Sequence, residues 1–179
     1  MSLALFVVQA LNGVQLGVLL FLIAAGLTLV FGVMDFINLA HGVQYMLGAY
    51  FGVMFYALTG SFPAALALTL AAALACGLAL EFLVFRHLYG RDHLEHVIAT
   101  FGIILFLNQG VKFVWGAAPL SLPTPQALSG SVGLMPGLLY PVWRLVIIGA
   151  GLAVALLLDV LVARTRVGML VRAGSTHAA

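Results

Sequence analysis

The sequence predicts an all-α, polytopic membrane protein with about five transmembrane helices. Of its 179 residues, 64% are hydrophobic and 7% are charged, whereas soluble domains carry about 25% charged residues. The few charges also leave long uncharged runs, and about 20 apolar residues suffice to cross a bilayer. This composition excludes a soluble enzyme, a disordered protein and a nucleic-acid-binding protein. The single cysteine, Cys76, excludes a disulfide framework and a cysteine metal cluster.

The uncharged runs place the helices in order along the chain. The predicted spans lie within Leu11–Phe31, at about His41–Leu58, at Pro63–Phe85, at about Val97–Trp115 and at about Val142–Val162. The uncharged run Phe36–Leu80 is long enough for two spans, and the turn-forming residues 59–63 divide it. Residues 1–10 either lengthen the first span or lie on the membrane surface. The uncharged connection Gly116–Pro141 is rich in proline and glycine, which predicts an irregular loop or lid. It is either an ordinary connector or a docking surface for an external protein.

The basic residues predict the orientation, because Lys and Arg concentrate in cytoplasmic loops. Arg86 and Arg91 lie between the third and fourth spans, and three arginines follow the fifth. Only Lys112 and Arg144 flank the connection between the fourth and fifth spans. We therefore expect the loop after the third span and the C-terminal tail to be cytoplasmic. Five spans then place the N-terminus outside.

The most informative segment lies between the first two spans. Its polar residues and flanking glycines are Gly32, Asp35, Asn38, His41 and Gly42. At helical spacing the three polar side chains would share one face. In one interpretation the segment is a short cytoplasmic turn, and Asn38 caps a helix that begins at Leu39. In the other, a helix is discontinuous around residues 32–42 within the membrane. The second half-helix then directs its positive N-terminus at the break, which suits a carboxylate.

Residues 26–42 read Gly-Leu-Thr-Leu-Val-Phe-Gly-Val-Met-Asp-Phe-Ile-Asn-Leu-Ala-His-Gly, and Tyr45-Met-Leu-Gly-Ala-Tyr50 follows. This stretch resembles the N-terminal signature of bacterial ABC importer permeases for branched-chain amino acids. Residues 81–91, 98–102, 107–109 and 165–174 resemble later parts of the same family, so the resemblance runs nearly end to end.

The resemblance implies a permease subunit in the bacterial inner membrane that translocates branched-chain or related hydrophobic amino acids. The implied partners are a second permease subunit, two cytoplasmic ATPase subunits and a periplasmic substrate-binding protein, besides membrane lipid. The chain itself would catalyse no reaction and hold no cofactor, since ATP would be bound by the ATPase subunits. In agreement, the sequence contains no Gly-x-x-x-x-Gly-Lys-Ser/Thr phosphate-binding loop. The resemblance also favours the discontinuous helix over the cytoplasmic turn, and it implies that the five residues Gly32, Asp35, Asn38, His41 and Gly42 lie along the substrate pathway.

Two departures from the family pattern limit what the resemblance implies. Many members carry an acidic residue directly after the His-Gly pair, where this chain has Val43, so a role of that acid does not carry over. Members also continue beyond the position of Ala179. We therefore expect residues 1–179 to be the N-terminal part of a transmembrane domain, a single domain truncated at its C-terminus. It is then either a fragment or the product of a truncated gene, which would be inactive alone.

Other polar residues have simpler expected roles. Asn108 and Gln109, in the fourth span, are expected to form hydrogen bonds between helices or to line the pore. Arg144 is expected to anchor the start of the fifth span at the interface. The pair His93-x-x-His96 lacks a third ligand at suitable spacing, so no metal site is predicted. The residues expected in an ATPase-facing loop are Arg164, Arg166, Gly168 and Arg172.

Two other functions remain open at this point. The same fold could serve urea or short-chain amides, and nothing in the sequence separates these substrates from amino acids. An intramembrane enzyme could use Asp35 and His41 as an acid–base pair. Such an enzyme needs the two groups within hydrogen-bond reach, usually with a nucleophile or a metal, and no Ser or Cys lies near them in the sequence.

Overall fold

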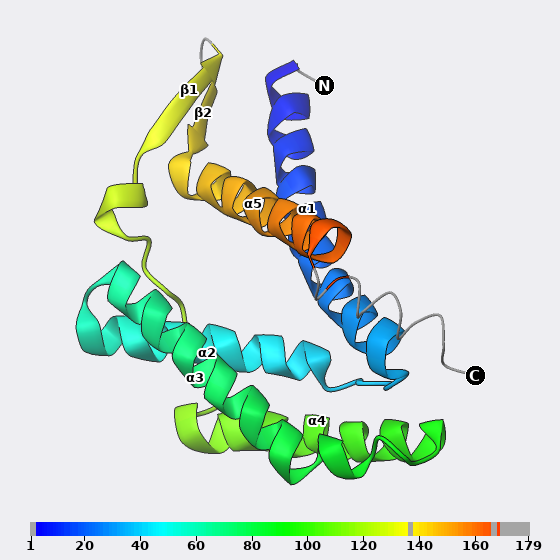
Figure 1. Ribbon diagram of the computed structural model, residues 1–179. Helices are drawn as coiled ribbons and strands as arrows, with labels where there is room; N and C mark the ends of the chain where they lie inside the picture. The colour runs from blue at the N-terminus through cyan, green and yellow to red at the C-terminus, as the bar shows by residue number, and fades with distance from the viewer. Residues whose placement is uncertain (1–2, 136–137, 166–167, 169–179) are drawn as a thin grey trace. The chain divides into compact units, whose positions relative to one another are not determined.

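A computed structural model describes residues 3–135, 138–165 and 168. These residues form five α-helices, two short 3-10 helices and one two-stranded hairpin (Figure 1). The elements are α1 (Leu3–Met34), α2 (His41–Thr59), α3 (Phe62–Leu83), η1 (Phe85–His87), α4 (His93–Trp115), η2 (Gln126–Leu128), β1 (Ser131–Met135), β2 (Leu138–Pro141) and α5 (Val142–Arg164). The predicted class, an all-α polytopic membrane protein, is confirmed, and the hairpin is an addition to it.

Four of the described helices are long and apolar enough to cross a membrane. They cover Leu3–Gly32, Phe62–His87, His93–Trp115 and Val142–Arg164. Helix α2 has the bounds predicted for the second span but is not among the four. Its 19 residues include Gln44 and the tyrosines at 45, 50 and 56, which make it more polar. Its role as a span stays a prediction.

The apolar side chains of these helices are largely uncovered by protein. Phe113 is 92% exposed, Phe106 75% and Leu74 65%. In water such a surface would aggregate or bind a partner, whereas in a bilayer the hydrocarbon chains cover it. The exposure therefore fits helices that face lipid.

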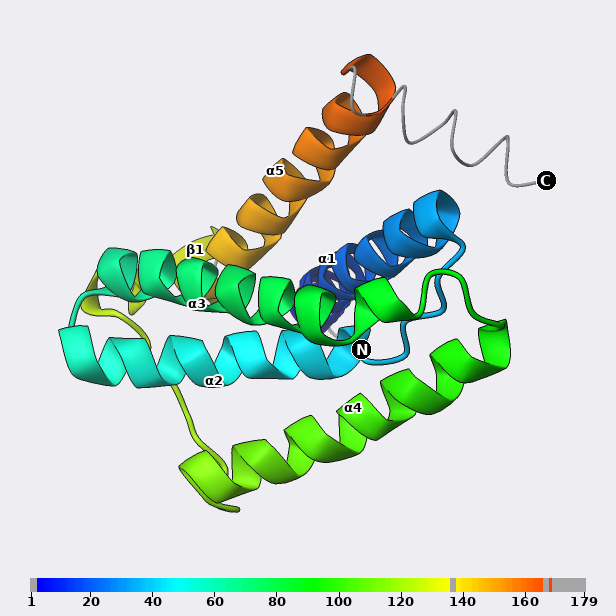
Figure 2. The same cartoon turned by 60° about the horizontal axis from the view of Figure 1, so that its bottom comes forward.

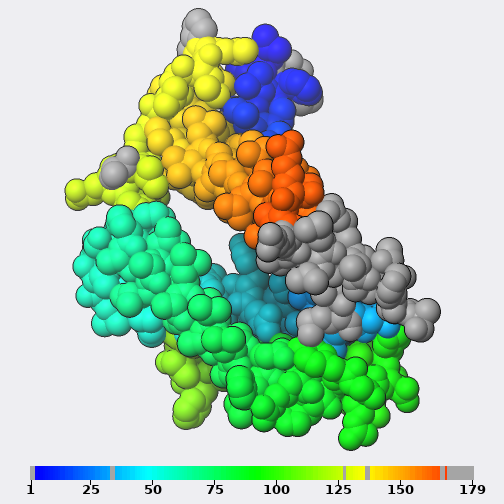
Figure 3. Space-filling model, in the orientation of Figure 1, coloured from blue at the N-terminus to red at the C-terminus, as the bar shows by residue number. Residues whose placement is uncertain are grey.

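The chain divides into two compact units. One comprises residues 1–28 and 124–179, and the other residues 29–123. In the 29–123 unit, α2 and α3 lie side by side and antiparallel, and α4 runs beside α2 (Figures 1 and 2). The side chains of α2 and α3, cyan to green in the space-filling view, form a continuous surface (Figure 3).

The turn between α2 and α3 lies where the sequence predicts it. Gly60 adopts a φ of 64°, and its amide donates to the carbonyl of Tyr56 at 2.9 Å. Glycine adopts this left-handed conformation without steric cost. Pro63 lies in the first turn of α3, where its missing N–H costs nothing. The turn over residues 59–63 is thus confirmed.

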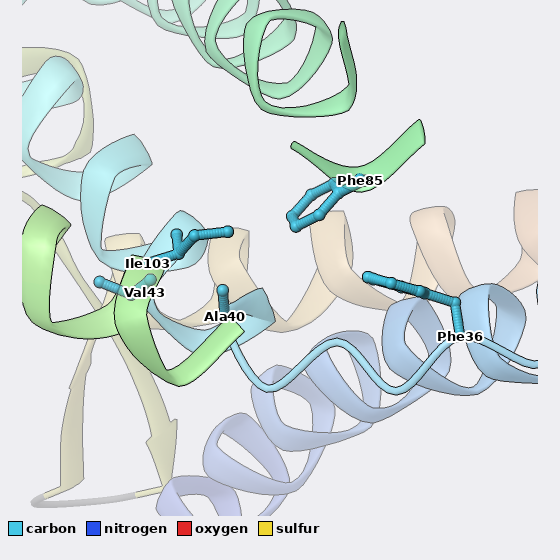
Figure 4. Close-up of a cluster of buried hydrophobic side chains, with 5 residues drawn as sticks. All are labelled: Phe36, Ala40, Val43, Phe85 and Ile103. Atoms are coloured by element: carbon cyan, nitrogen blue, oxygen red, sulfur yellow. The ribbon is translucent and has the colours of Figure 1, made fainter. Parts of the chain in front are cut away.

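The core of the 29–123 unit joins three segments that are distant in sequence. Its buried residues are Phe36, Ala40, Val43, Phe85 and Ile103 (Figure 4). The first three lie in the continuous stretch that leads into the start of α2, Phe85 lies in η1, and Ile103 lies in α4. Further apolar residues, among them Leu80 and Leu107, pack around this cluster. The core therefore fixes residues 35–40 against the first half of α4.

In the other unit, the connection that precedes α5 is more ordered than predicted. Strands β1 and β2 pair antiparallel, with Val132 opposite Tyr140 and a register irregularity between Gly133 and Met135. Burial alternates along β2, since Tyr140 is 1% exposed and Leu139 71%, as expected for a strand with one covered face. The prediction of an irregular loop is wrong over residues 131–135 and 138–141.

Helix α5 approaches α1 closely at one glycine. A Cβ atom on Gly151 would collide with Cγ1 of Val18, so the neighbouring side chain would have to move. Small residues allow such approach between membrane helices. The sequence pair Gly13-x-x-x-Gly17 does not act in this way among the described residues, because a Cβ on either glycine would meet no atom within 4 Å.

Candidate functional site

Helix α1 ends beside the first polar residue that the sequence singled out. Asp35 has a φ of 50°, and its amide donates to the carbonyl of Phe31 at 2.9 Å. This left-handed conformation ends a helix, and Asp tolerates it better than most residues. Residues 35–40 are not helical, and α2 begins at His41. The interruption lies where the sequence predicts it, whereas its depth in a membrane stays a prediction.

Because the backbone is not helical here, Asp35, Asn38 and His41 do not share a helical face. That expectation is wrong. The Asp35 side chain is 57% exposed, Asn38 is 5% exposed, and His41 is half-buried. The three side chains therefore lie in three different environments.

Asp35 pairs with a residue that lies far away in the sequence. Its Oδ2 is 3.1 Å from Nε2 of His93, in the first turn of α4, and both side chains are 57% exposed. Ion pairs this exposed stabilise a fold by about 1 kcal/mol or less. The pair therefore orients the segment more than it stabilises it.

Phe36 provides the tighter attachment. It is 2% exposed, and its ring centroid lies 5.3 Å from that of Phe85, 5.6 Å from that of Tyr89 and 4.6 Å from that of His96. Tilted and edge-to-face arrangements at these distances are favourable for aromatic rings. Burial of the Phe36 ring thus holds the interrupted segment in place.

Asn38 does not cap α2, so this part of the cytoplasmic-turn interpretation is wrong, whereas the position of the segment in the cytoplasm or within the membrane stays a prediction. The helix begins at His41, its N-cap position is Ala40, and no side chain caps it. Instead, the backbone carbonyl of Asn38 accepts a hydrogen bond from the amide of His41 at 3.4 Å. The side-chain Oδ1 of Asn38 is buried and has no hydrogen-bond partner among the described residues. A buried polar atom without a hydrogen-bond partner destabilises the folded state, and such an atom in a folded protein often indicates a functional role.

The two glycines of the segment leave space beside the backbone. Gly32 and Gly42 are both exposed, and a Cβ on either would meet no atom within 4 Å. Close packing therefore does not require glycine at these positions within the described structure. Their place in a substrate pathway stays a prediction.

His96 is a feature of the site that sequence reasoning missed. It is 3% exposed, its Nε2 lies 2.8 Å from the carbonyl oxygen of Leu88, and its Nδ1 is buried without a partner. Thr100, fully buried, donates to the carbonyl of His96 at 2.7 Å. The spacing of His96 and Thr100, about one helical turn apart, indicates in the sequence that the two residues lie on the same face of α4.

Beside the site, the hydroxyl of Tyr89 donates to Oε2 of Glu81. Burial of the phenol, followed by this hydrogen bond and the charge of Glu81, raises the pKa of Tyr89 well above its usual range. No group of three or more metal-ligating side chains occurs within the described part of the chain.

The remaining predicted residues are not brought to this site. Asn108 is half-buried and Gln109 is exposed, and neither side chain forms a hydrogen bond within the described ranges. Arg164 is exposed at the end of α5, and Gly168 is buried. Arg166 and Arg172 lie outside the described residues. The roles of these residues in a pore or in ATPase contact stay predictions.

The described helices have the exposed apolar surfaces of helices that face lipid, and the interrupted segment packs against a neighbouring helix. These features define a multi-pass membrane protein. Comparison with known proteins defines the class as a transport permease. Over residues 9–176 the chain matches the family described as branched-chain amino acid transport system / permease component, and it belongs to that family. Family membership confirms the prediction of a transport subunit instead of an enzyme.

Two relatives illustrate the similarity. The chain is 30% identical over 178 residues to the high-affinity branched-chain amino acid transport system permease protein BraD of Pseudomonas aeruginosa, an alignment that covers 92% of this chain and 57% of that protein. It is 31% identical over 132 residues to the corresponding permease protein LivH of Escherichia coli K12, covering 66% of this chain and 42% of that protein. The matched part of the chain thus spans 57% of the length of the first relative and 42% of the length of the second. No solved structure matches it.

Proposed function

We propose that the chain is part of the permease subunit of an ATP-driven importer that translocates branched-chain amino acids across the bacterial inner membrane. The observation that supports this most strongly is the family match over residues 9–176, which includes the interrupted segment and all five helices but the first residues of α1. The relatives are named as high-affinity branched-chain amino acid permeases.

The proposed assembly follows from the family. A second permease subunit completes the pathway, two cytoplasmic ATPase subunits hydrolyse ATP, and a periplasmic binding protein delivers the substrate. The N-terminus lies outside and the tail after α5 is cytoplasmic, because arginines concentrate after α3 and after α5. Arg164, Arg166, Gly168 and Arg172 then face the ATPase, and Asn108 and Gln109 lie near the pathway.

In this proposal the interrupted segment adjoins the substrate pathway. Support comes from Asn38, whose buried side-chain oxygen lacks a partner, and from α2, whose N-terminus no side chain caps. A carboxylate near that N-terminus would meet free backbone N–H groups, and an ammonium group would satisfy the oxygen of Asn38.

Uptake into proteoliposomes tests the function. The complete importer, with its ATPase and binding protein, is expected to accumulate radiolabelled leucine only when ATP is supplied inside. Accumulation of urea or a short-chain amide without leucine would reassign the substrate. Leucine movement independent of ATP would refute the importer. Asn38→Leu is expected to reduce leucine uptake, whereas Gln126→Leu, at an exposed position in η2, serves as the matched control.

Thiol labelling tests the depth of the segment. Single cysteines at positions 34–43, in a Cys76→Ser background, are expected to react slowly with a membrane-impermeant maleimide. Immediate and uniform labelling from the cytoplasmic side would show that the segment is an ordinary cytoplasmic turn.

A further inference from the structure

A polar cluster lies in the 1–28 and 124–179 unit, away from the interrupted segment in sequence. The side-chain oxygen of Asn12, on α1, accepts a hydrogen bond from the hydroxyl of Tyr140 at 3.1 Å and a second one from Nη1 of Arg144. The amide nitrogen of Asn12 donates to Gln9 at 3.4 Å. Tyr140 is 1% exposed, and its hydroxyl lies in this cluster. The cluster therefore fixes the guanidinium of Arg144 in the first turn of α5.

The guanidinium has more donors than the cluster satisfies. Arginine carries five N–H groups, and one nitrogen, Nη1, is bonded to Asn12. Its Nε is buried and has no hydrogen-bond partner within the described residues. A buried charged donor without an acceptor is strongly unfavourable. The arrangement therefore calls for a further acceptor beside Arg144.

No acidic side chain of this unit can serve as that acceptor. The unit contains one acidic residue, Asp159, which is 15 residues further along α5 and so about 22 Å away along the helix axis. Charged residues at a membrane are normally paired or functional. A guanidinium prefers planar or tetrahedral oxyanions, to which it can donate two parallel hydrogen bonds.

We propose that Arg144, held by Asn12, binds an oxyanion at the start of α5. The oxyanion is the carboxylate of an amino acid on the outer side or the phosphate of an anionic lipid headgroup. The first source rests on the proposed function, and the second does not. The simple role predicted from sequence, anchoring of the span at the interface, gives no reason for a buried, unpaired Nε.

Trp143 provides a reporter beside the site. The guanidinium carbon of Arg144 lies 5.1 Å from the centroid of the Trp143 ring, so an anion that draws the guanidinium away changes the surroundings of the indole. The chain contains two tryptophans, and Trp115→Phe leaves Trp143 alone. The full chain in phosphatidylcholine nanodiscs is titrated with leucine and, as a matched ligand without a carboxylate, with leucinamide. A second set of nanodiscs contains phosphatidylglycerol.

The outcomes separate the two sources. A saturable change of Trp143 emission with leucine but not leucinamide supports a carboxylate site. A change with phosphatidylglycerol alone supports the same site with a lipid phosphate. Either response is expected to weaken by about 10- to 100-fold in Arg144→Gln and to persist in Arg164→Gln, an exposed arginine at the other end of α5. A response to neither anion, or one retained in Arg144→Gln when that variant melts like the parent, would overturn the proposal. The lipid arm remains decisive even if the importer takes up no leucine.

Discussion

Replacement of Phe36 by alanine is expected to loosen the interrupted segment from α4. The ring is 2% exposed and touches three other rings. Removing a buried phenylalanine side chain costs about 3–5 kcal/mol, from lost contacts and from the cavity left behind. For a chain of this size, 3 kcal/mol corresponds to a fall in Tm of about 6–12 °C.

The single cysteine supplies the assay. Cys76 lies half-buried on α3, in the same unit as Phe36, so heating in the presence of a fluorogenic maleimide reports the opening of that unit. Phe36→Leu keeps much of the volume and is expected to lower the Tm by a third of the alanine effect or less. Phe113→Ala, at a position that is 92% exposed, is the matched control and should leave the Tm nearly unchanged. Equal shifts for Phe36→Ala and Phe113→Ala would refute the inference that Phe36 holds the segment.

Three further predictions concern other contacts. Gly151→Ala is expected to destabilise the packing of α5 against α1 by about 1–3 kcal/mol, measured in thermal melts. The added substitution Val18→Ala should recover most of that loss. An unchanged Tm in Gly151→Ala would contradict the close contact. Asp35→Asn removes an exposed ion pair and should change stability by less than about 1 kcal/mol, but it should lower leucine uptake if the segment adjoins the pathway; unchanged uptake would count against that placement. The raised pKa of Tyr89 means that the folded chain keeps the phenolic proton where the unfolded chain loses it. The stability that this phenol contributes is therefore present below pH 10 and declines as the pH rises further. In a spectrophotometric titration, Glu81→Gln should lower the pKa of Tyr89 only in part, because burial is the largest cause of the shift. An unchanged pKa of Tyr89 in Glu81→Gln would exclude the contribution of Glu81.

The sequence predicts the helices well because their cause is local. Uncharged apolar runs set the spans, and the observed bounds of α5, Val142–Arg164, differ from the predicted ones by two residues at one end. Turn residues placed the α2–α3 connection in the same way. Helix α4 begins earlier than predicted, at His93, because polar residues of its first turn were assigned to the loop.

The contacts of the candidate site could not be predicted in this way. Asp35 and His93 are 58 residues apart, and Asn12 and Arg144 are 132 apart. No local pattern encodes such a pairing, because it depends on how the helices pack. The environment of Asn38 could not be predicted locally either. Its residue type suggested a helix cap, whereas burial of Phe36 and Ala40 places the start of α2 after it.

The two arginines of α5 limit how that helix can move. Arg144 and Arg164 are 20 residues apart, which is about 30 Å along a helix, close to the thickness of the hydrocarbon layer. Each side chain can reach a different aqueous boundary at the same time. A piston-like shift of the helix by one turn, about 5.4 Å, would draw one guanidinium into hydrocarbon at a cost of several kcal/mol. We therefore expect α5 to tilt or rotate during transport while its depth stays constant.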